Sequence, residues 1–250
     1  MSFTSAAFWL FCLVVVAAHA AAPPRFRWPI LLTASYVFYG SFGLGILAVL
    51  VGLTAVVFVA SRAMAGADGR LRRVLLIAAL AVPLAALVVF KYLSLFRDTI
   101  LYLAGRLPAA AEPFNLLVPI GISFYVFKLI SYSLDVYHRR TPAETHPGHF
   151  ALYVAYFPQI LAGPIERAGH LLPQVRDARR ADAAGVLAGV RLVAWGLFKK
   201  LVVANRLALY VGEVFAAPEY KSLHLVFAAG LYYIQIYCDF SGYSDVSTGI

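Results

Sequence analysis

Long apolar runs separated by short basic loops are the feature of this sequence that most limits how it can fold. Candidate membrane spans lie at residues 5–22, 30–61, 74–96, 114–137, 186–212 and 222–240. A helix needs roughly 20 apolar residues to cross the hydrocarbon core of a bilayer. Only 13% of the 250 residues are charged, whereas a soluble domain holds about 25%. We predict an all-α, polytopic integral membrane helical bundle, with 1–250 as a single transmembrane domain.

The net charge of +9 comes largely from basic residues placed between the apolar runs. In membrane proteins, Lys and Arg in short loops mark the cytoplasmic side. We therefore predict that the chain contacts membrane lipid and has no nucleic-acid partner. The expected cytoplasmic residues are Arg25, Arg27, Arg62, Arg70, Arg72, Arg73, His138, Arg139 and Arg140. The charge-balanced loop 97–113 is expected on the outer side.

The run 30–61 is either one long helix or a tight pair of helices. Basic loops lie on both sides of it, around Arg27 and Arg62. If both loops are cytoplasmic, the run must cross the membrane twice or re-enter on the same side. The segment from Gly40 to Gly45 supplies the expected break.

The shorter apolar stretch 150–165 is also flanked by basic residues on both sides. If both flanks are cytoplasmic, the stretch must enter and leave the membrane on one side. Pro158-Gln159 and Gly163-Pro164 break a helix and place an amide at membrane depth. A broken backbone is tolerated there only where protein buries it or it lines a wet cavity. We predict a re-entrant segment, with an ordinary short kinked helix as the alternative.

Ionisable residues inside membrane spans usually face the interior of a helix bundle. Lys91, Asp135 and Glu213 lie near the ends of predicted spans, where interfacial placement explains them. Lys128 lies deeper, and a carboxylate partner would give it a structural role.

The end of the chain gathers carboxylates, a carboxamide and hydroxyl groups within a few turns. On a helix, Gln235 and Asp239 share a face because they are four residues apart. We expect Ser241-Gly242 to interrupt the helix before Tyr243 and Asp245. Such a cluster either lines a polar tunnel or orients a catalytic group, and the alternative is a tyrosine-rich interfacial belt.

Other recognisable chemistry is absent from the sequence. Cys12 and Cys238 lie in apolar stretches and show no metal-ligand spacing. His146 and His149 are three residues apart in a proline-containing loop, with no third ligand evident. We predict no metal site and no tightly bound cofactor.

Four blocks in order resemble the membrane-bound O-acyltransferase family, and most of all its bacterial branch that acetylates alginate. The first block runs from Gly121 to Phe127 and leads into Ser131 to Tyr137. The others are Tyr156 to Ile165, with the sequence Tyr-Phe-Pro-Gln-Ile-Leu-Ala-Gly-Pro-Ile, then Gly196 to Lys200, and finally Gln235 to Asp245. The similarity runs from roughly residue 30 to the last residue.

The resemblance implies a multi-helix fold around a funnel and transfer of an acyl group across the bacterial inner membrane. The donor would be acetyl-CoA or another acyl thioester in the cytoplasm. The acceptor would be an extracytoplasmic polysaccharide such as alginate, reached with the help of periplasmic acetyltransferase partner proteins. Relatives acting on other envelope polymers share these blocks, so the acceptor stays open.

The family's essential histidine belongs to a Trp-His block downstream of Asp-Phe-Ser-Gly-Tyr-Ser-Asp. No residue up to Ile250 takes that place, so no catalytic residue is assignable, and we expect the chain to be the N-terminal portion of a longer protein. The candidate residues for lining the tunnel or orienting that histidine are Gln159, Gln235, Asp239, Tyr243 and Asp245. A membrane transporter and a non-catalytic membrane scaffold are the alternative functions.

Overall fold

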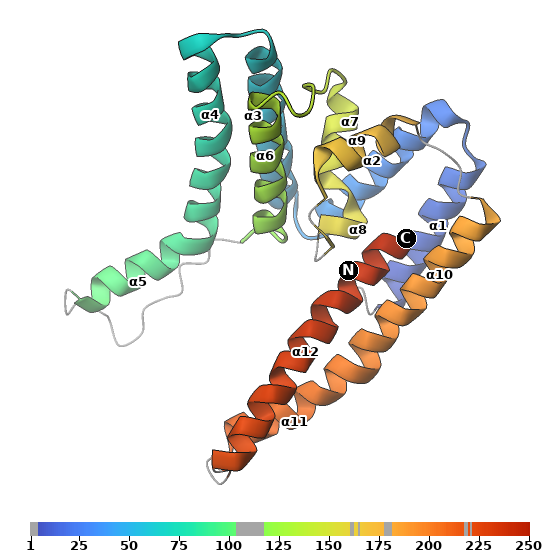
Figure 1. Cartoon of the computed structure of the whole chain (residues 1–250), viewed down its shortest axis with the longest axis vertical. Coiled ribbons are helices and arrows are strands. Elements are labelled where there is room, and N and C mark those ends of the chain that lie inside the picture. The colour runs from blue at the N-terminus through green and yellow to red at the C-terminus, as the bar shows by residue number, and fades with distance from the viewer. Residues whose placement is uncertain are drawn as a thin grey trace. The chain divides into compact units, whose positions relative to one another are not determined.

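The computed structural model describes residues 5–103, 118–160, 163–164, 166–177, 182–217, 220 and 222–250. These residues form helices and no strand, which confirms the all-α prediction (Figure 1). The chain divides into two compact units: unit 1 comprises residues 1–160 and 165–179, and unit 2 comprises 161–164 and 180–250. Whether 1–250 acts as one transmembrane domain stays a prediction.

Unit 1 is built from nine α-helices within the described ranges. They are α1 (Ala6–Ala21), α2 (Pro24–Gly40), α3 (Leu44–Ala65), α4 (Gly69–Leu87), α5 (Leu93–Leu103), α6 (Ile122–Tyr137), α7 (Pro147–Ala155), α8 (Phe157–Ile160) and α9 (Ala168–Asp177). A π-helical segment, η1 (Val88–Tyr92), joins α4 to α5. Helices α3, α4 and α6 pack against one another, and α2 packs against α7.

The run 30–61 contains the break expected between Gly40 and Gly45. Helix α2 ends at Gly40 and α3 begins at Leu44. Gly43 has a φ of 141°, a backbone conformation that residues with a Cβ rarely adopt. The interpretation as a tight helix pair is therefore confirmed.

The described part of the segment 150–165 contains a broken helix. Helix α7 ends at Ala155, Tyr156 has a ψ of 107°, and α8 restarts at Phe157. The break lies two residues before Pro158, because a proline fits the first turn of a helix but not its interior. Helix α9 then packs against α7, and the Tyr153 hydroxyl donates to the Glu166 carbonyl oxygen at 3.3 Å. Its re-entrant placement in a membrane stays a prediction.

The basic loops that the sequence assigns to one side of the membrane meet at one end of unit 1. Arg62 donates to the Thr145 carbonyl oxygen at 2.6 Å, and Arg72 donates to the Tyr137 carbonyl oxygen at 2.7 Å. Trp28, near the start of α2, contacts His146 with ring centroids 4.8 Å apart. Helix α5 lies at the opposite end of α4 (Figure 1). We call the meeting point of these loops the basic end of unit 1; its exposed cations are Arg25, Arg62, Arg70, Arg73, Arg139 and Arg140.

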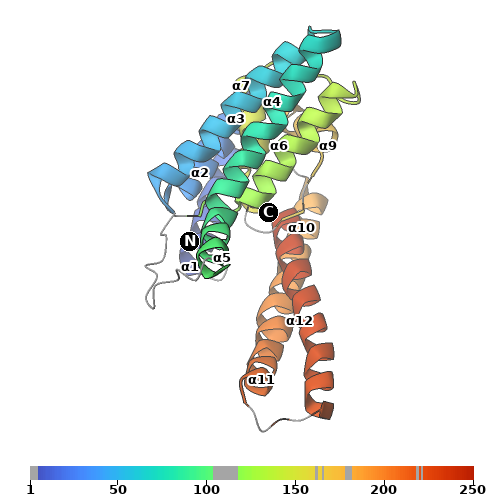
Figure 2. The same ribbon diagram turned by 90° about the vertical axis from the view of Figure 1, so that its left-hand side faces the viewer.

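Unit 2 is a long helical hairpin (Figure 2). Its first arm consists of α10 (Ala183–Leu197), the π-helical segment η2 (Phe198–Ala204) and α11 (Asn205–Ala216). Its second arm, α12 (Ser222–Gly249), packs along this arm.

The expected interruption of the last helix at Ser241-Gly242 is wrong, because α12 runs unbroken to Gly249. Gly242 serves close packing instead of a turn. A Cβ on Gly196 would lie 2.5 Å from the Gly242 carbonyl oxygen, and a Cβ on Gly189 would lie 2.6 Å from that of Gly249. Small residues let two helices approach at backbone distance, which is a common way for membrane helices to pack.

Three helical stretches among the described residues are long and apolar enough to cross a membrane: Leu44–Ala65, Gly69–Tyr92 and Ser222–Gly249. They overlap the predicted spans 30–61, 74–96 and 222–240. Together with the all-α architecture they support a membrane protein. Helices α1 and α6 have 16 residues each and are shorter than the spans predicted there.

Candidate functional site

The first predicted site residue, Gln159, lies in unit 1 at the break between α7 and α8. The Lys128 ammonium donates to the Gln159 side-chain oxygen at 2.9 Å and to the Tyr153 carbonyl oxygen at 2.8 Å. Lys128 is 4% exposed and Gln159 is 8% exposed. The expectation of a carboxylate partner for Lys128 is not met, since both of these hydrogen-bond acceptors are neutral oxygens.

The helix break explains why a lysine is buried there. In a continuous helix, the Tyr153 carbonyl would accept from the N–H of Phe157. That N–H instead donates to the Ser35 hydroxyl at 3.2 Å, which leaves the carbonyl to the Lys128 ammonium. A cation at a helix C-terminus also interacts favourably with the helix dipole. Lys128 therefore holds the broken helix and orients Gln159.

The remaining predicted site residues lie together in unit 2, where two lysines of η2 meet α12. The Lys199 ammonium lies 2.5 Å from the Asp245 carboxylate and donates to the Ser241 hydroxyl at 2.5 Å. The Lys200 ammonium forms an ion pair with Asp239. We call this set the lysine–aspartate cluster: Lys199, Lys200, Asp239, Ser241, Tyr243 and Asp245.

Tyr243 joins the cluster through its ring. The Lys200 ammonium lies 5.0 Å from the centre of the Tyr243 ring, within the range of a cation–π interaction. A single ammonium thus bridges a carboxylate and an aromatic ring one turn apart on α12. The unbroken helix makes this possible, because it keeps Asp239 and Tyr243 on one face.

Gln235 lies one turn before Asp239 on α12. Its side-chain oxygen is buried and has no hydrogen-bond partner among the described residues. A buried polar atom of this kind is rare in native structures and calls for an explanation such as a ligand or an ordered water. It therefore remains a candidate for lining a polar passage.

The cluster is electrically balanced, with two ammonium groups facing two carboxylates. The side chains of Lys199 and Lys200 are 13% and 19% exposed. Pairing lowers the cost of holding charge at membrane depth, where isolated charges are strongly disfavoured. The π-helical segment η2 carries both lysines, and single turns of π-helix occur frequently at functional sites.

The lysines and Ser241 are the members that sequence reasoning left without a role. The signal was present in the block from Gly196 to Lys200, which places two cations inside a predicted span. Cations in a span require counter-charges. Asp239 and Asp245 lie about forty residues further along the chain, and their register against Lys199 and Lys200 depends on how the two arms pack.

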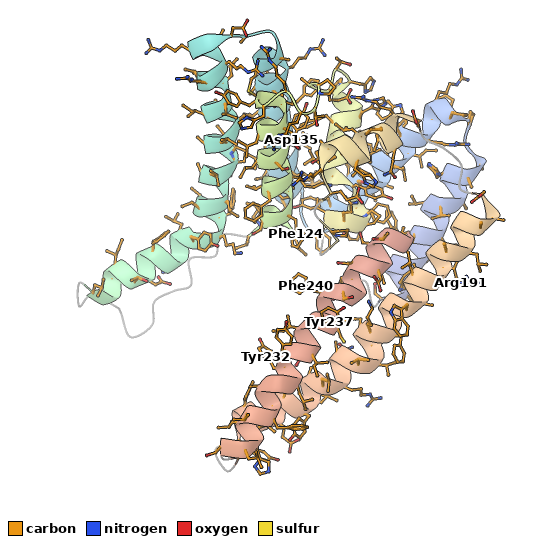
Figure 3. The ribbon with its side chains drawn as sticks, in the orientation of Figure 1. Phe124, Asp135, Arg191, Tyr232, Tyr237 and Phe240 are labelled. Carbon is orange, nitrogen blue, oxygen red and sulfur yellow. The ribbon has the colours of Figure 1, made fainter. Side chains whose placement is uncertain are left out.

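The three ionisable residues predicted near span ends make polar contacts, and their interfacial placement stays a prediction. Asp135 lies 3.9 Å from Arg140 beyond the end of α6, and Figure 3 shows it toward the opposite end of that helix from Phe124. Glu213, near the end of α11, accepts from the Tyr220 hydroxyl at 3.1 Å. Lys91 donates to the Ser123 hydroxyl at 3.3 Å. These contacts are local and require no role in chemistry.

The face of α12 that points away from α10 is aromatic. Figure 3 shows Phe240 on that side, and its side chain is 58% exposed. Tyr237 is 65% exposed, whereas the ring of Tyr232 lies 6.1 Å from that of Phe215 on α11. Tyrosines are enriched where a protein meets the membrane interface, and the interpretation as an interfacial belt stays a prediction.

The fold and the cluster define a helical membrane protein with half-buried, paired charges in one of its hairpins. No family model matches the chain. The chain is 34% identical to the probable alginate O-acetylase AlgI of Pseudomonas syringae pv. tomato, over 100% of its own length and 49% of that protein. The same values hold for the probable alginate O-acetylase AlgI of Pseudomonas aeruginosa.

A relative named for another polymer also matches. The peptidoglycan O-acetyltransferase of Helicobacter pylori is 30% identical over 88% of this chain and 46% of that protein. The chain spans about half the length of the curated relatives it matches. These matches confirm the resemblance to the membrane-bound O-acyltransferase family that the four sequence blocks indicate.

Proposed function

We propose that the chain forms part of a membrane-bound O-acetyltransferase of the bacterial inner membrane. The donor is acetyl-CoA or another acyl thioester on the cytoplasmic side, and the acceptor is an extracytoplasmic polysaccharide such as alginate. Periplasmic acetyltransferase proteins complete the transfer. The observation that carries this proposal is the similarity of the whole chain to proteins named as O-acetylases.

In this reaction an acceptor hydroxyl attacks the thioester carbonyl, the new ester C–O bond forms and the C–S bond breaks. The hydroxyl proton passes through a general base and ends on the departing thiol. Gln235, Asp239, Tyr243 and Asp245 line the passage or orient the base as positioning residues. Gln159 has the corresponding role in unit 1.

A chimera tests this proposal in the context of a full-length protein. Residues 1–250 replace the matching part of the Pseudomonas aeruginosa relative in an alginate-producing strain that lacks its own copy. We expect ester-linked acetyl groups on the exported alginate, measured by proton NMR. A chimera that is present in the membrane but adds no acetyl groups would contradict the proposal.

Asp239→Asn in the same chimera tests the site. We expect at least a tenfold loss of acetylation with the protein retained in the membrane, because the ion pair with Lys200 is lost. Asp68→Asn is the matched control, since its side chain is 87% exposed at the basic end. Equal acetylation by both variants would remove Asp239 from the site.

A further inference from the structure

Unit 1 contains a cavity that the candidate site does not use. Its volume is about 430 Å³, and it lies between the end of α1, the start of α2, and helices α7 and α9. This volume lies within the range of about 300–1,000 Å³ that small-molecule sites occupy. Leu152, Leu171 and Val175 line it and are buried, and Leu31 lines it from α2.

Part of the cavity lining is polar, and its residue Trp28 belongs to the basic end. His19 and Gln174 line it, and so does Trp28, whose ring also contacts His146. Arg25 is exposed and lies one turn before Trp28 on the same face of α2. The cavity therefore combines an apolar lining with one carboxylate, that of Asp177, and Arg25 lies one turn from the lining residue Trp28.

Helix α9 forms one wall and is amphipathic. Leu171, Leu172 and Val175 are buried against unit 1, whereas His170 and Gln174 are exposed. Short helices with one apolar and one polar face lie in the plane of the membrane interface. This wall places the cavity at the depth where lipid headgroups meet acyl chains.

We propose that the cavity binds one phospholipid from the leaflet at the basic end. One acyl chain lies between Leu31, Leu152 and Leu171. The headgroup lies at the polar lining, with its phosphate toward Arg25 at the basic end and its ammonium toward the Asp177 carboxylate. The apolar lining excludes a ligand that is polar throughout, and the basic end complements a phosphate. The inference stands independently of acetyl transfer.

Trp28 serves as the reporter for a binding experiment. The variant Trp9→Phe/Trp195→Phe leaves Trp28 as the sole tryptophan of the chain. The purified chain in dodecyl maltoside is titrated with phosphatidylethanolamine that carries bromine on its acyl chains. We expect quenching of Trp28 fluorescence that saturates at one lipid per chain, and native mass spectrometry that retains one phospholipid.

Cavity variants separate this site from lipid around the protein. Leu31→Phe fills the cavity and removes the saturable phase, whereas Leu13→Phe is the matched control, since Leu13 is 68% exposed on α1. Arg25→Gln weakens binding by about tenfold, as expected for one charge-assisted contact. If Leu31→Phe fails to fold by circular dichroism, Val175→Ile fills the cavity more gently.

Two results would overturn the proposal. Quenching that rises without saturation, equally in Leu31→Phe and Leu13→Phe, would mean that only surrounding lipid is sensed. Acetyl-CoA that quenches or shifts Trp28 emission and displaces the brominated lipid would assign the cavity to a thioester donor instead. Because neither readout uses acetyl transfer, failure here leaves the chimera experiment unaffected.

Discussion

At the scale of single residues, the buried carboxylate of Glu144 in unit 1 is matched by several hydrogen-bond donors. Glu144, 2% exposed, accepts from the backbone N–H groups of Thr145 and His146 at 2.8 and 2.9 Å. Its other oxygen accepts from Arg176 at 2.5 and 2.8 Å. Burial alone would raise the pKa of the Glu144 carboxyl, but the hydrogen bonds from His146 and Arg176 outweigh it and hold that pKa below its usual value.

Because its pKa is lowered, Glu144 should make the stability of unit 1 depend on pH. A lowered folded-state pKa means that Glu144 stabilises unit 1 above its unfolded-state pKa of about 4.3. The contribution is lost as the pH falls through the folded-state value. We expect Glu144→Gln to lower the free energy of unfolding by about 1–3 kcal/mol at neutral pH and to flatten the loss of stability in acid. Thermal melts across the acid range measure both, and unchanged melts would show that the contact with Arg176 is inconsequential.

The ion pair between Asp239 and Lys200 can be tested by exchanging the two charges and measuring the free energy of unfolding. Asp239→Asn alone leaves the Lys200 ammonium without its carboxylate. Because the Asp239 side chain is 37% exposed, we expect a loss of about 1 kcal/mol. The double variant Asp239→Lys/Lys200→Asp restores opposite charges and should recover most of that stability.

The same exchange separates structure from chemistry when it is made in the chimera. We expect the double variant to melt near the parent temperature while acetylation stays low, because a positioning carboxylate has moved to the other arm. Recovery of full acetylation together with stability would reduce Asp239 to a purely structural ion pair.

At the scale of elements, the glycines of unit 2 set how closely its two arms pack. Gly196 and Gly242 lie in contact, and so do Gly189 and Gly249. Gly189 lies seven residues before Gly196 on the first arm, and Gly249 lies seven residues after Gly242 on the second. This spacing keeps both contacts on one face of each helix. The lysine–aspartate cluster lies beside the first contact, so the approach of the arms brings Lys199 and Lys200 within reach of α12.

We predict opposite effects of the same substitution at two glycines. Gly196→Ala places a Cβ 2.5 Å from the Gly242 carbonyl oxygen and should destabilise the hairpin by about 1–3 kcal/mol. Gly230→Ala meets nothing within 4 Å on α12 and should be neutral or stabilise it by up to about 1 kcal/mol. Thermal unfolding in detergent compares the two, and equal effects would show that close packing at Gly196 is not required.

At the scale of the whole molecule, the distribution of charge indicates how unit 1 lies in the membrane. The basic loops meet at one end, while α5 lies at the other end of α4. Both positions follow from the alternation of basic and balanced loops, since each crossing moves the chain to the other side.

Cysteine labelling from each side of the membrane tests this orientation. In a background without Cys12 and Cys238, Thr145→Cys and Gly66→Cys should react only with reagent on the cytoplasmic side. Leu103→Cys, at the end of α5 and 78% exposed, should react only from outside. Labelling of Thr145→Cys and Leu103→Cys from the same side would contradict the orientation.

The sequence by itself determined the all-α membrane class, the helix pair around Gly43 and the common end of the basic loops. Hydropathy, glycine and loop charge act locally, so they can be read along the chain. Only the tertiary structure decided the break at Tyr156, the unbroken course of α12 and the pairing of Lys199 and Lys200 with Asp245 and Asp239. Whether Gly242 bends a helix or admits a neighbour depends on the helix packed against it, and that partner lies more than forty residues away in the sequence.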